Sequence, residues 1–165
     1  MNDTLIEILV ERKPSVGTKL AKSACLLLTI LFACLSPFIG LFMALSAVAT
    51  GFITYFLGLR SELEYEYSYF DKEIDIDVIY SKQRRKHLIT LDLTKLEILA
   101  PKSSYKLDEY KNRVNRISDY TSAMPENEKK VYSMIFSDGR RIDIEPTSQL
   151  VETIARFAPR KVFRN

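Results

Sequence analysis

Charged side chains are missing from a long central stretch: no Asp, Glu, Lys or Arg occurs from Ser23 to Leu59. A single helix of these 37 residues would measure about 55 Å, nearly twice the ~30 Å hydrocarbon layer of a bilayer. Two helices of about 17 residues each would measure ~26 Å, near the lower limit for a span. Ser36-Pro37 lies near the middle of the stretch, where a turn is needed. The sequence therefore predicts a transmembrane hairpin of two helices over residues 18–60.

Residue types that catalysis and metal binding require are scarce. The chain has one histidine, His87, and its two cysteines, Cys25 and Cys34, both lie in the uncharged stretch. Zinc sites and Ser-His-Asp or Cys-His catalytic groups therefore lack their parts. The five glycines form no glycine-rich phosphate loop. We expect no enzyme activity, no catalytic or metal-binding residues, no cofactor and no small-molecule substrate.

A strong positive charge is also missing from the C-terminal part of the chain. Residues 62–165 contain 19 Lys and Arg against 18 Asp and Glu, so we expect no nucleic-acid partner. The excess of basic residues flanks the uncharged stretch, with Arg12, Lys13, Lys19 and Lys22 before it and Arg60 after it. By the positive-inside rule both flanks are cytoplasmic. We predict a multi-pass protein of the cell membrane, integral to the lipid bilayer, with cytoplasmic N- and C-termini.

A cleaved signal sequence is the alternative interpretation of the apolar stretch. Leu31-Phe32-Ala33-Cys34 loosely resembles the lipidation site of a bacterial lipoprotein. Phe32 is bulky where such sites have small residues, and apolar sequence continues well beyond Cys34. These two features favour the hairpin.

The segments at and before the hairpin leave several interpretations open. Residues 1–17 predict an amphipathic helix that lies in the membrane interface, docks on the soluble part or binds a partner. Within the hairpin, small residues recur on one face of the second helix, where they favour either packing inside the hairpin or homo-oligomerisation. These residues are Ser36, Gly40, Ala44, Ala47 and Gly51.

From Glu62 onward the pattern changes to alternating polar and apolar residues, which is typical of half-buried strands. We predict a meander of four strands at 62–69, 73–80, 85–92 and 95–100, followed by a helical turn within 102–113 and a short strand at 115–121. Asp138-Gly139 predicts a tight hairpin between 131–136 and a strand containing Ile142 and Ile144. A helix is expected from Thr147, the expected N-cap, to Pro159.

About seven antiparallel strands followed by one amphipathic helix resemble a pleckstrin-homology-like (PH-like) domain, although an unrelated α+β arrangement is the alternative. Several motifs resemble a family of small, uncharacterised bacterial membrane proteins with two helices, a domain of unknown function. The motifs include Glu64-Tyr65-Glu66-Tyr67, Ile74-Asp75-Ile76-Asp77 with Arg84-Arg85-Lys86, Leu96-Glu97-Ile98-Leu99-Ala100-Pro101 and Pro159-Arg160-Lys161-Val162-Phe163. The resemblance implies an α+β membrane protein whose N-terminal transmembrane hairpin precedes a mainly antiparallel, cytoplasmic PH-like domain with a C-terminal helix, at residues 61–165. It implies no activity.

Three groups of residues are candidates for a site. Lys82, Arg84, Arg85 and Lys86 predict either contact with anionic lipid headgroups, worth about 1 kcal/mol per residue, or a solvated turn. Asp75 and Asp77 share one face of a strand, which we interpret as a solvent face in preference to a metal or acid–base site. Tyr65, Tyr67 and Tyr69 are interpreted as core in preference to a ligand groove.

These features favour a non-enzymatic, membrane-anchored module that binds a protein partner through its cytoplasmic domain. Two alternatives are an anionic-lipid sensor and a structural membrane subunit that oligomerises through the hairpin.

Overall fold

The computed structural model describes residues 5–164, which form two compact units. The first, here called the β unit, contains the chain up to Arg12 together with Glu64–Ile79 and the chain from Arg85 onward. The second, the hairpin unit, contains Lys13–Leu63 and Tyr80–Arg84. The chain therefore enters the β unit first, leaves it for the helices, and returns to it.

Strand β1 (Ile6–Arg12) begins the β unit, where we predicted an amphipathic helix over residues 1–17. That prediction is wrong for the described residues. Ile6, Ile8 and Val10 are buried while Leu5 and Leu9 are exposed, which is the two-residue period of a strand. The apolar residues fit a helical period as well, and pairing with the neighbouring strand β2 decides between the two. Residues 1–4 of this predicted helix lie outside the described residues.

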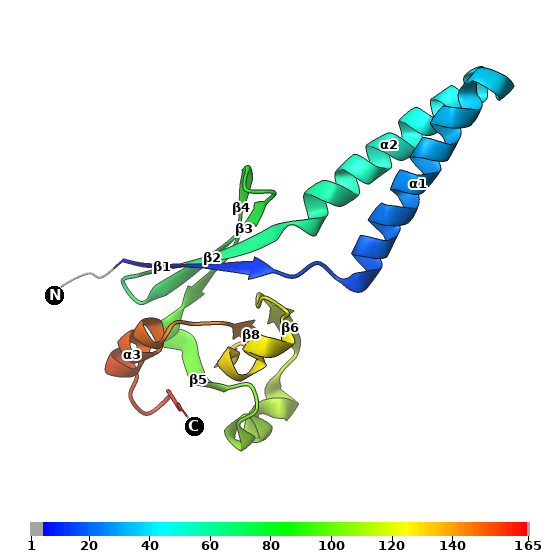
Figure 1. The fold of residues 1–165 in the computed structure, drawn as a ribbon. Helices are drawn as coiled ribbons and strands as arrows, with labels where there is room; N and C mark the ends of the chain where they lie inside the picture. Colours follow the sequence, from blue (N-terminus) through cyan, green and yellow to red (C-terminus); the bar gives the residue numbers. More distant parts are fainter. Residues whose placement is uncertain (1–4, 165) are drawn as a thin grey trace. The chain divides into compact units, whose positions relative to one another are not determined.

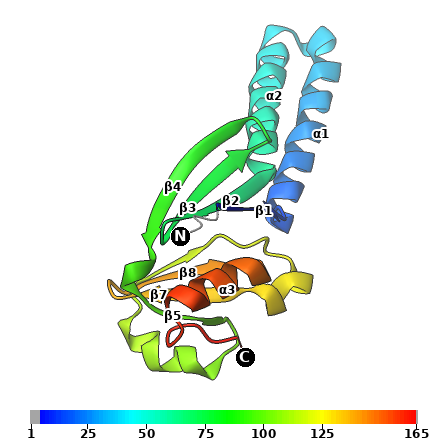
Figure 2. The same cartoon turned by 90° about the vertical axis from the view of Figure 1, so that its left-hand side faces the viewer.

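The hairpin unit contains two long apolar helices that pack along each other in both views (Figures 1 and 2). They are α1 (Val16–Ile39) and α2 (Leu41–Ser61). Ser15 caps α1 by accepting a hydrogen bond from the Thr18 amide at 3.2 Å. At 24 and 21 residues, the helices measure about 36 and 32 Å.

The helices are longer than the 17 residues that we predicted, and the turn lies at Gly40 instead of Ser36-Pro37. Gly40 has a φ of 94°, a conformation that glycine adopts without strain. Pro37 lies in the last turn of α1, where it has no amide to donate to the Ala33 carbonyl, and the helix ends two residues later at Ile39. At the other end α1 begins well before the uncharged stretch and includes Lys19 and Lys22.

The β unit contains two four-stranded sheets. The first has the order β1-β2-β3-β4, with β2 at Leu63–Phe70, β3 at Glu73–Tyr80 and β4 at Arg84–Asp92. The second has the order β5-β7-β8-β6, with β5 at Leu96–Pro101, β6 at Arg116–Asp119, β7 at Tyr132–Phe136 and β8 at Arg140–Ile144. The predicted strand positions are confirmed, but the predicted four-strand meander is divided between the two sheets. The 3-10 helix η1 (Leu93–Lys95) lies at the division, and β5 pairs with β7.

The second sheet is mostly antiparallel, but β6 runs parallel to β8. The segments that connect its strands include the 3-10 helices η2 (Tyr105–Arg113) and η3 (Pro125–Lys130). Gly139 closes the β7–β8 hairpin with a φ of 81°, as the Asp-Gly pair predicted.

Helix α3 (Ser148–Phe157) ends the fold and lies beside the second sheet in Figure 2. Thr147 is its N-cap, as predicted, and accepts from the Leu150 amide at 3.4 Å. Leu150, Val151 and Ile154 are buried, so the apolar side of the helix contributes to the core.

Candidate interaction site

Charged side chains from β2, β3 and β4 form a network on one face of the first sheet. Arg85 lies 2.7 Å from Asp77 and 2.6 Å from Glu66. His87 Nδ1 lies 2.8 Å from the second carboxylate oxygen of Asp77. The positive charge of Arg85 is therefore balanced by two carboxylates within the β unit.

Asp75 and Asp77 lie on this polar face of β3, as we interpreted them from the alternation. Asp75 accepts a hydrogen bond of 2.5 Å from the Thr90 hydroxyl, and Asp77 is occupied by Arg85 and His87. Among residues 5–164, no three His, Cys, Asp or Glu side chains are grouped so that they could hold a metal ion.

The four basic residues of the predicted lipid-binding run are divided between the two units. Arg85 and Lys86 belong to the β unit, whereas Lys82 and Arg84 belong to the hairpin unit; all four are exposed. The division matters because only the second pair belongs to the same compact unit as the apolar helices.

The turn Tyr80–Arg84 is hydrogen-bonded to the end of α2. The Ser81 amide donates to the Glu62 carbonyl at 2.8 Å, and the Ser81 hydroxyl donates to the Leu59 carbonyl at 3.2 Å. Ser81 and Lys82 have φ values of 46° and 57°, in the left-handed region that costs a non-glycine residue about 1 kcal/mol. A lysine is thus held in a tight turn where glycine or asparagine is usual.

Lys22 lies at the same end of the hairpin. A Cβ atom on Gly58 would be 3.6 Å from the Lys22 ammonium, so the missing side chain leaves room for this cation over α2. The end of the hairpin that carries the turn is therefore basic, and the Gly40 end holds no charged residue.

The small residues predicted on one face of the second helix are distributed over the hairpin. Ser36 lies in α1, Gly40 is the turn residue, and Ala44, Ala47 and Gly51 lie half-buried in α2. A Cβ on Gly51 would lie 3.7 Å from Thr29 of α1. Gly51 at least faces the other helix of the same hairpin.

The tyrosines of β2 are mainly core residues, as predicted. Tyr65 and Tyr67 are buried, and Tyr69 is half-buried. The Tyr67 hydroxyl donates to the Tyr120 carbonyl, and burial, the largest influence, raises the pKa of Tyr67 far above its ordinary value.

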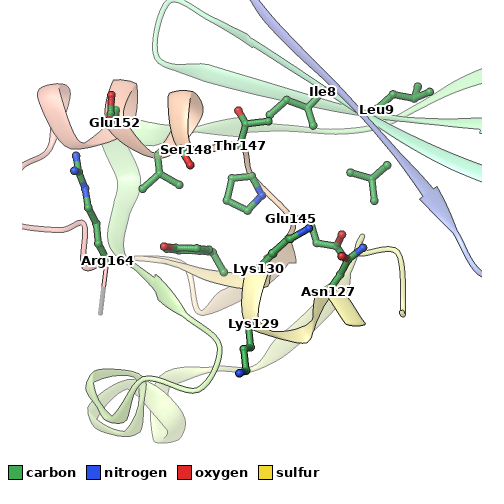
Figure 3. A pocket seen from close by; sticks show the side chains of 14 residues that line it. Ile8, Leu9, Asn127, Lys129, Lys130, Glu145, Thr147, Ser148, Glu152 and Arg164 are labelled. Atoms are coloured by element: carbon green, nitrogen blue, oxygen red, sulfur yellow. The ribbon is translucent and has the colours of Figure 1, made fainter. Parts of the chain in front are cut away.

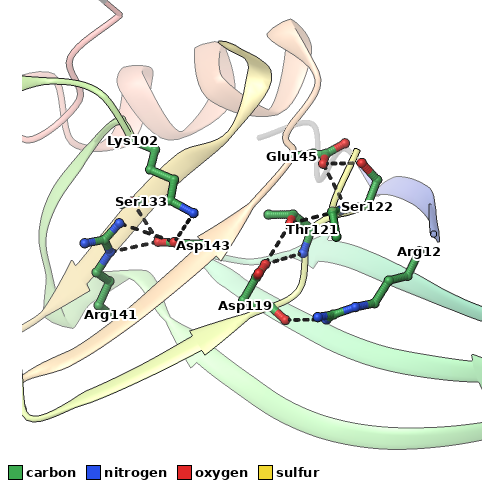
Figure 4. A network of polar contacts seen from close by, with 10 residues as sticks. Arg12, Lys102, Asp119, Thr121, Ser122, Ser133, Arg141, Asp143 and Glu145 are labelled. Atoms are coloured by element: carbon green, nitrogen blue, oxygen red, sulfur yellow. Dashed lines mark hydrogen bonds and ion pairs between the residues drawn. The ribbon is translucent and has the colours of Figure 1, made fainter. Parts of the chain in front are cut away.

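Arg12, the last residue of β1, connects the strand to the rest of the β unit through hydrogen bonds (Figure 4). Its guanidinium donates to the Tyr65 hydroxyl at 2.8 Å and to the Asp119 carbonyl at 2.9 Å. The Asp119 carboxylate accepts from the amide and hydroxyl of Thr121. Burial acts to raise the pKa of Asp119, but these hydrogen bonds and the charge of Arg12 lower it below its ordinary value.

Asp143 is a buried carboxylate with a complete set of partners (Figure 4). It accepts from the Ser133 hydroxyl at 2.7 Å and from Arg141 Nε at 2.9 Å, and it lies 3.2 Å from the Lys102 ammonium. The Asp143 side chain is 3% exposed, against 44% for Lys102. The cluster is fully paired, which favours a structural role within the second sheet.

A groove of about 760 Å³ lies between β1, the start of α3 and the segment that precedes β7 (Figure 3). Its apolar lining includes Ile8, Leu9, Val10, Pro146 and Val151, and its polar lining includes Lys129, Lys130 and Arg164. We did not predict this groove, because residues 8–10 were expected in a helix that lies in the membrane interface, docks on the soluble part or binds a partner, and not in a strand of the domain.

The elements define an α+β class of protein with two four-stranded sheets and a C-terminal helix, in which two long apolar helices lie between the first two strands of the chain. The chain belongs to the family described as "Bacterial PH-like domain (DUF6106)", whose model matches residues 2–164. The match includes the helices, so the hairpin is part of what the family shares. No curated protein and no solved structure matches the chain.

Proposed function

We propose that this protein is a non-enzymatic, membrane-anchored module whose PH-like domain binds a protein partner at the cytoplasmic face. The observation that carries the proposal is the place of the hairpin in the chain. Three residues join β1 to α1 and one joins α2 to β2. A domain tethered through two neighbouring strands cannot diffuse away from its anchor.

The surface of the helices supports a place in the bilayer. Both are long and apolar enough to span it, and no residue in their apolar windows is buried. Large side chains are exposed along both helices, among them Leu27, Ile30, Phe42, Phe52 and Phe56. Soluble proteins rarely expose an apolar surface of this extent, whereas lipid would cover it.

The position of β1 argues against the alternative of a cleaved signal sequence. β1 precedes α1 and contributes Ile6, Ile8 and Val10 to the core of the β unit. Cleavage within or after α1 would separate this strand from the chain that it packs against.

Cysteine labelling in intact cells tests the location. In a chain with Cys25→Ser and Cys34→Ala, we expect Phe38→Cys, next to the hairpin turn, to react with a membrane-impermeant thiol reagent. Ser137→Cys, exposed in the β7–β8 turn, should react only after permeabilisation. Labelling of Ser137→Cys in intact cells would reject the cytoplasmic domain.

In-cell crosslinking tests the protein partner. The full chain should give a defined crosslinked product that a chain reduced to the hairpin, residues 13–62, does not give. Identical products from both chains would reject the β unit as the interaction module. A catalytic turnover that depends on Asp75, Asp77 or His87 would reject the non-enzymatic assignment.

Contact with anionic lipid is a second candidate, favoured by the bonds from Ser81 to the end of α2. If the helices span the membrane, Lys22, Lys82 and Arg84 lie at headgroup level, where each contributes about 1 kcal/mol. Arg85 is less suited because Asp77 and Glu66 occupy it. Homo-oligomerisation through the small residues has less support, because Gly51 faces α1.

Native mass spectrometry of the full chain in detergent tests the lipid contact. The wild-type chain should retain phosphatidylglycerol in preference to phosphatidylcholine, and Lys82→Gln with Arg84→Gln should abolish the preference. Arg116→Gln with Arg160→Gln, an exposed pair in the β unit, is the control. An unchanged preference in the first variant would show that the turn makes no lipid contact.

A further inference from the structure

We propose that the groove between β1 and α3 binds an extended acidic segment of a protein partner. This inference rests on the proposed function and adds the place and the chemistry of the contact.

The size of the groove suits several side chains of a peptide. Its volume of about 760 Å³ lies in the upper part of the range of ordinary ligand sites, about 300–1,000 Å³. Val151 of α3 is buried, as are Ile8 and Val10 of β1. Leu9 is 54% exposed and stays available for contact.

The rim of the groove is cationic towards an incoming ligand. Lys129, Lys130 and Arg164 are all exposed. Of the two acidic lining residues, Glu145 accepts hydrogen bonds from the Ser122 amide at 2.8 Å and from the Ser122 hydroxyl at 2.6 Å. Glu145 and Glu152 are the two carboxylates of the lining, and they stand against three cations, so the lining keeps an excess of one positive charge.

The start of α3 adds to this potential. The first turn of the 10-residue helix contains no acidic residue, so its positive end is not compensated there. Thr147 and Ser148, at this end, line the groove. Figure 3 shows Lys129, Lys130 and Asn127 across the groove from Ile8 and Leu9.

β1 supplies an edge for a peptide backbone. In the described chain β1 is the outer strand of its sheet and has β2 as its one neighbour. An extended peptide can add to such an edge through main-chain hydrogen bonds, while alternate side chains enter adjoining pockets. Apolar side chains of the peptide would pack on the exposed Leu9, and carboxylates would meet Lys129 and Lys130.

The test uses the full chain in phosphatidylcholine nanodiscs and a peptide that carries fluorescein on its N-terminal amine, fluorescein-Glu-Val-Glu-Val-Glu-Val-Glu-amide. Anisotropy should show saturable binding that weakens about tenfold or more in Lys129→Glu with Lys130→Glu. Arg116→Glu with Arg160→Glu changes the net charge equally and lies outside the groove, so it should bind as the wild type does. The peptide with Gln in place of Glu should bind much more weakly.

Hydrogen exchange shows where the peptide binds. Amides of residues 6–12 should exchange more slowly when the acidic peptide is present. Equal binding of the Glu and Gln peptides, equal weakening by both double variants, or unchanged exchange in β1 would each overturn the proposal. So would displacement of the peptide by phosphatidylglycerol vesicles, because the groove would then be a lipid site.

The failure of this proposal differs from the failure of the proposed function. If the in-cell crosslinked product of the full chain persists in Lys129→Glu with Lys130→Glu, the domain is an interaction module that uses another surface. If the full chain gives no product beyond that of the hairpin alone, the proposed function itself fails.

Discussion

Removing β1 should unfold the PH-like domain, whereas removing the hairpin should not. One chain begins at Glu62 and lacks β1; the other joins Arg12 to Leu63 through a Gly-Ser-Gly linker and lacks residues 13–62. Both chains lack the hairpin and keep every residue after it, but only the second chain keeps β1 and therefore both complete sheets. The comparison therefore isolates the contribution of one strand.

The magnitude follows from burial. Ile6, Ile8 and Val10 are 6%, 9% and 8% exposed. Burying one such side chain is worth about 1.5–3 kcal/mol, so the three contribute roughly 4.5–9 kcal/mol as an upper estimate. Loss of the Arg12 hydrogen bonds to Tyr65 and Asp119 adds to this. A domain of this size is stable by about 5–15 kcal/mol, so the truncated chain should be largely unfolded.

Urea denaturation followed by tyrosine fluorescence and near-UV circular dichroism measures both chains. The chain with the linker should unfold cooperatively, and the chain from Glu62 should show no cooperative transition. Ile8→Ala in the linked chain should cost about 2–5 kcal/mol, and Leu9→Ala, at an exposed position of the same strand, should cost little. A truncated chain as stable as the linked chain would refute the inclusion of β1 in the core.

Three further predictions concern the β unit and use the linked chain. Burial raises the pKa of Tyr67, so the unfolded chain loses the hydroxyl proton of this tyrosine near pH 10 while the folded chain keeps it. The free energy of unfolding should therefore keep its full value below about pH 10 and be about 1.4 kcal/mol lower at pH 11. Urea titrations at both pH values measure the fall, and Tyr67→Phe should reduce it. Asp143→Ala leaves Lys102 and Arg141 without their buried partner and should lower the free energy of unfolding by about 2 kcal/mol or more. Asp108→Ala, which breaks an exposed ion pair, should lower it by less than about 0.5 kcal/mol. Equal losses in the two variants would contradict the argument from burial. Gly139→Ala places a Cβ atom 2.7 Å from the Arg113 carbonyl oxygen at a residue with positive φ. This should lower the free energy of unfolding by about 2 kcal/mol and the melting temperature by several degrees. The control Ser137→Ala should leave the melting temperature unchanged.

The strands from β2 to β8 were predictable because each has a local pattern. Alternation in residues 62–69 and 73–80, the Asp138-Gly139 turn and the Thr147 cap are all contained within a few neighbouring residues. The assignment of β5 to the second sheet was not predictable, because it depends on pairing with β7 about 30 residues later along the chain.

β1 shows why the groove was missed. Leu5, Ile6, Ile8, Leu9 and Val10 satisfy a helical and a strand period alike, and the partner that resolves the ambiguity lies beyond the hairpin. With residues 8–10 assigned to a helix instead of a strand, nothing in the sequence indicated a sheet edge beside α3, and the groove was not predicted. The basic turn was found from composition alone, but its division between Arg85 and the pair Lys82 and Arg84 required the hydrogen bonds of Ser81.

The insertion of the helices between β1 and β2 also sets an order of events during synthesis. β1 leaves the ribosome first, and its neighbour β2 follows only after residues 13–62 have been made. Until then the apolar side chains of β1 have no sheet to join, and its unpaired edge is open to wrong pairings. The β unit is therefore completed only after both apolar helices have emerged, so a chain that stops within the hairpin cannot yield a finished domain.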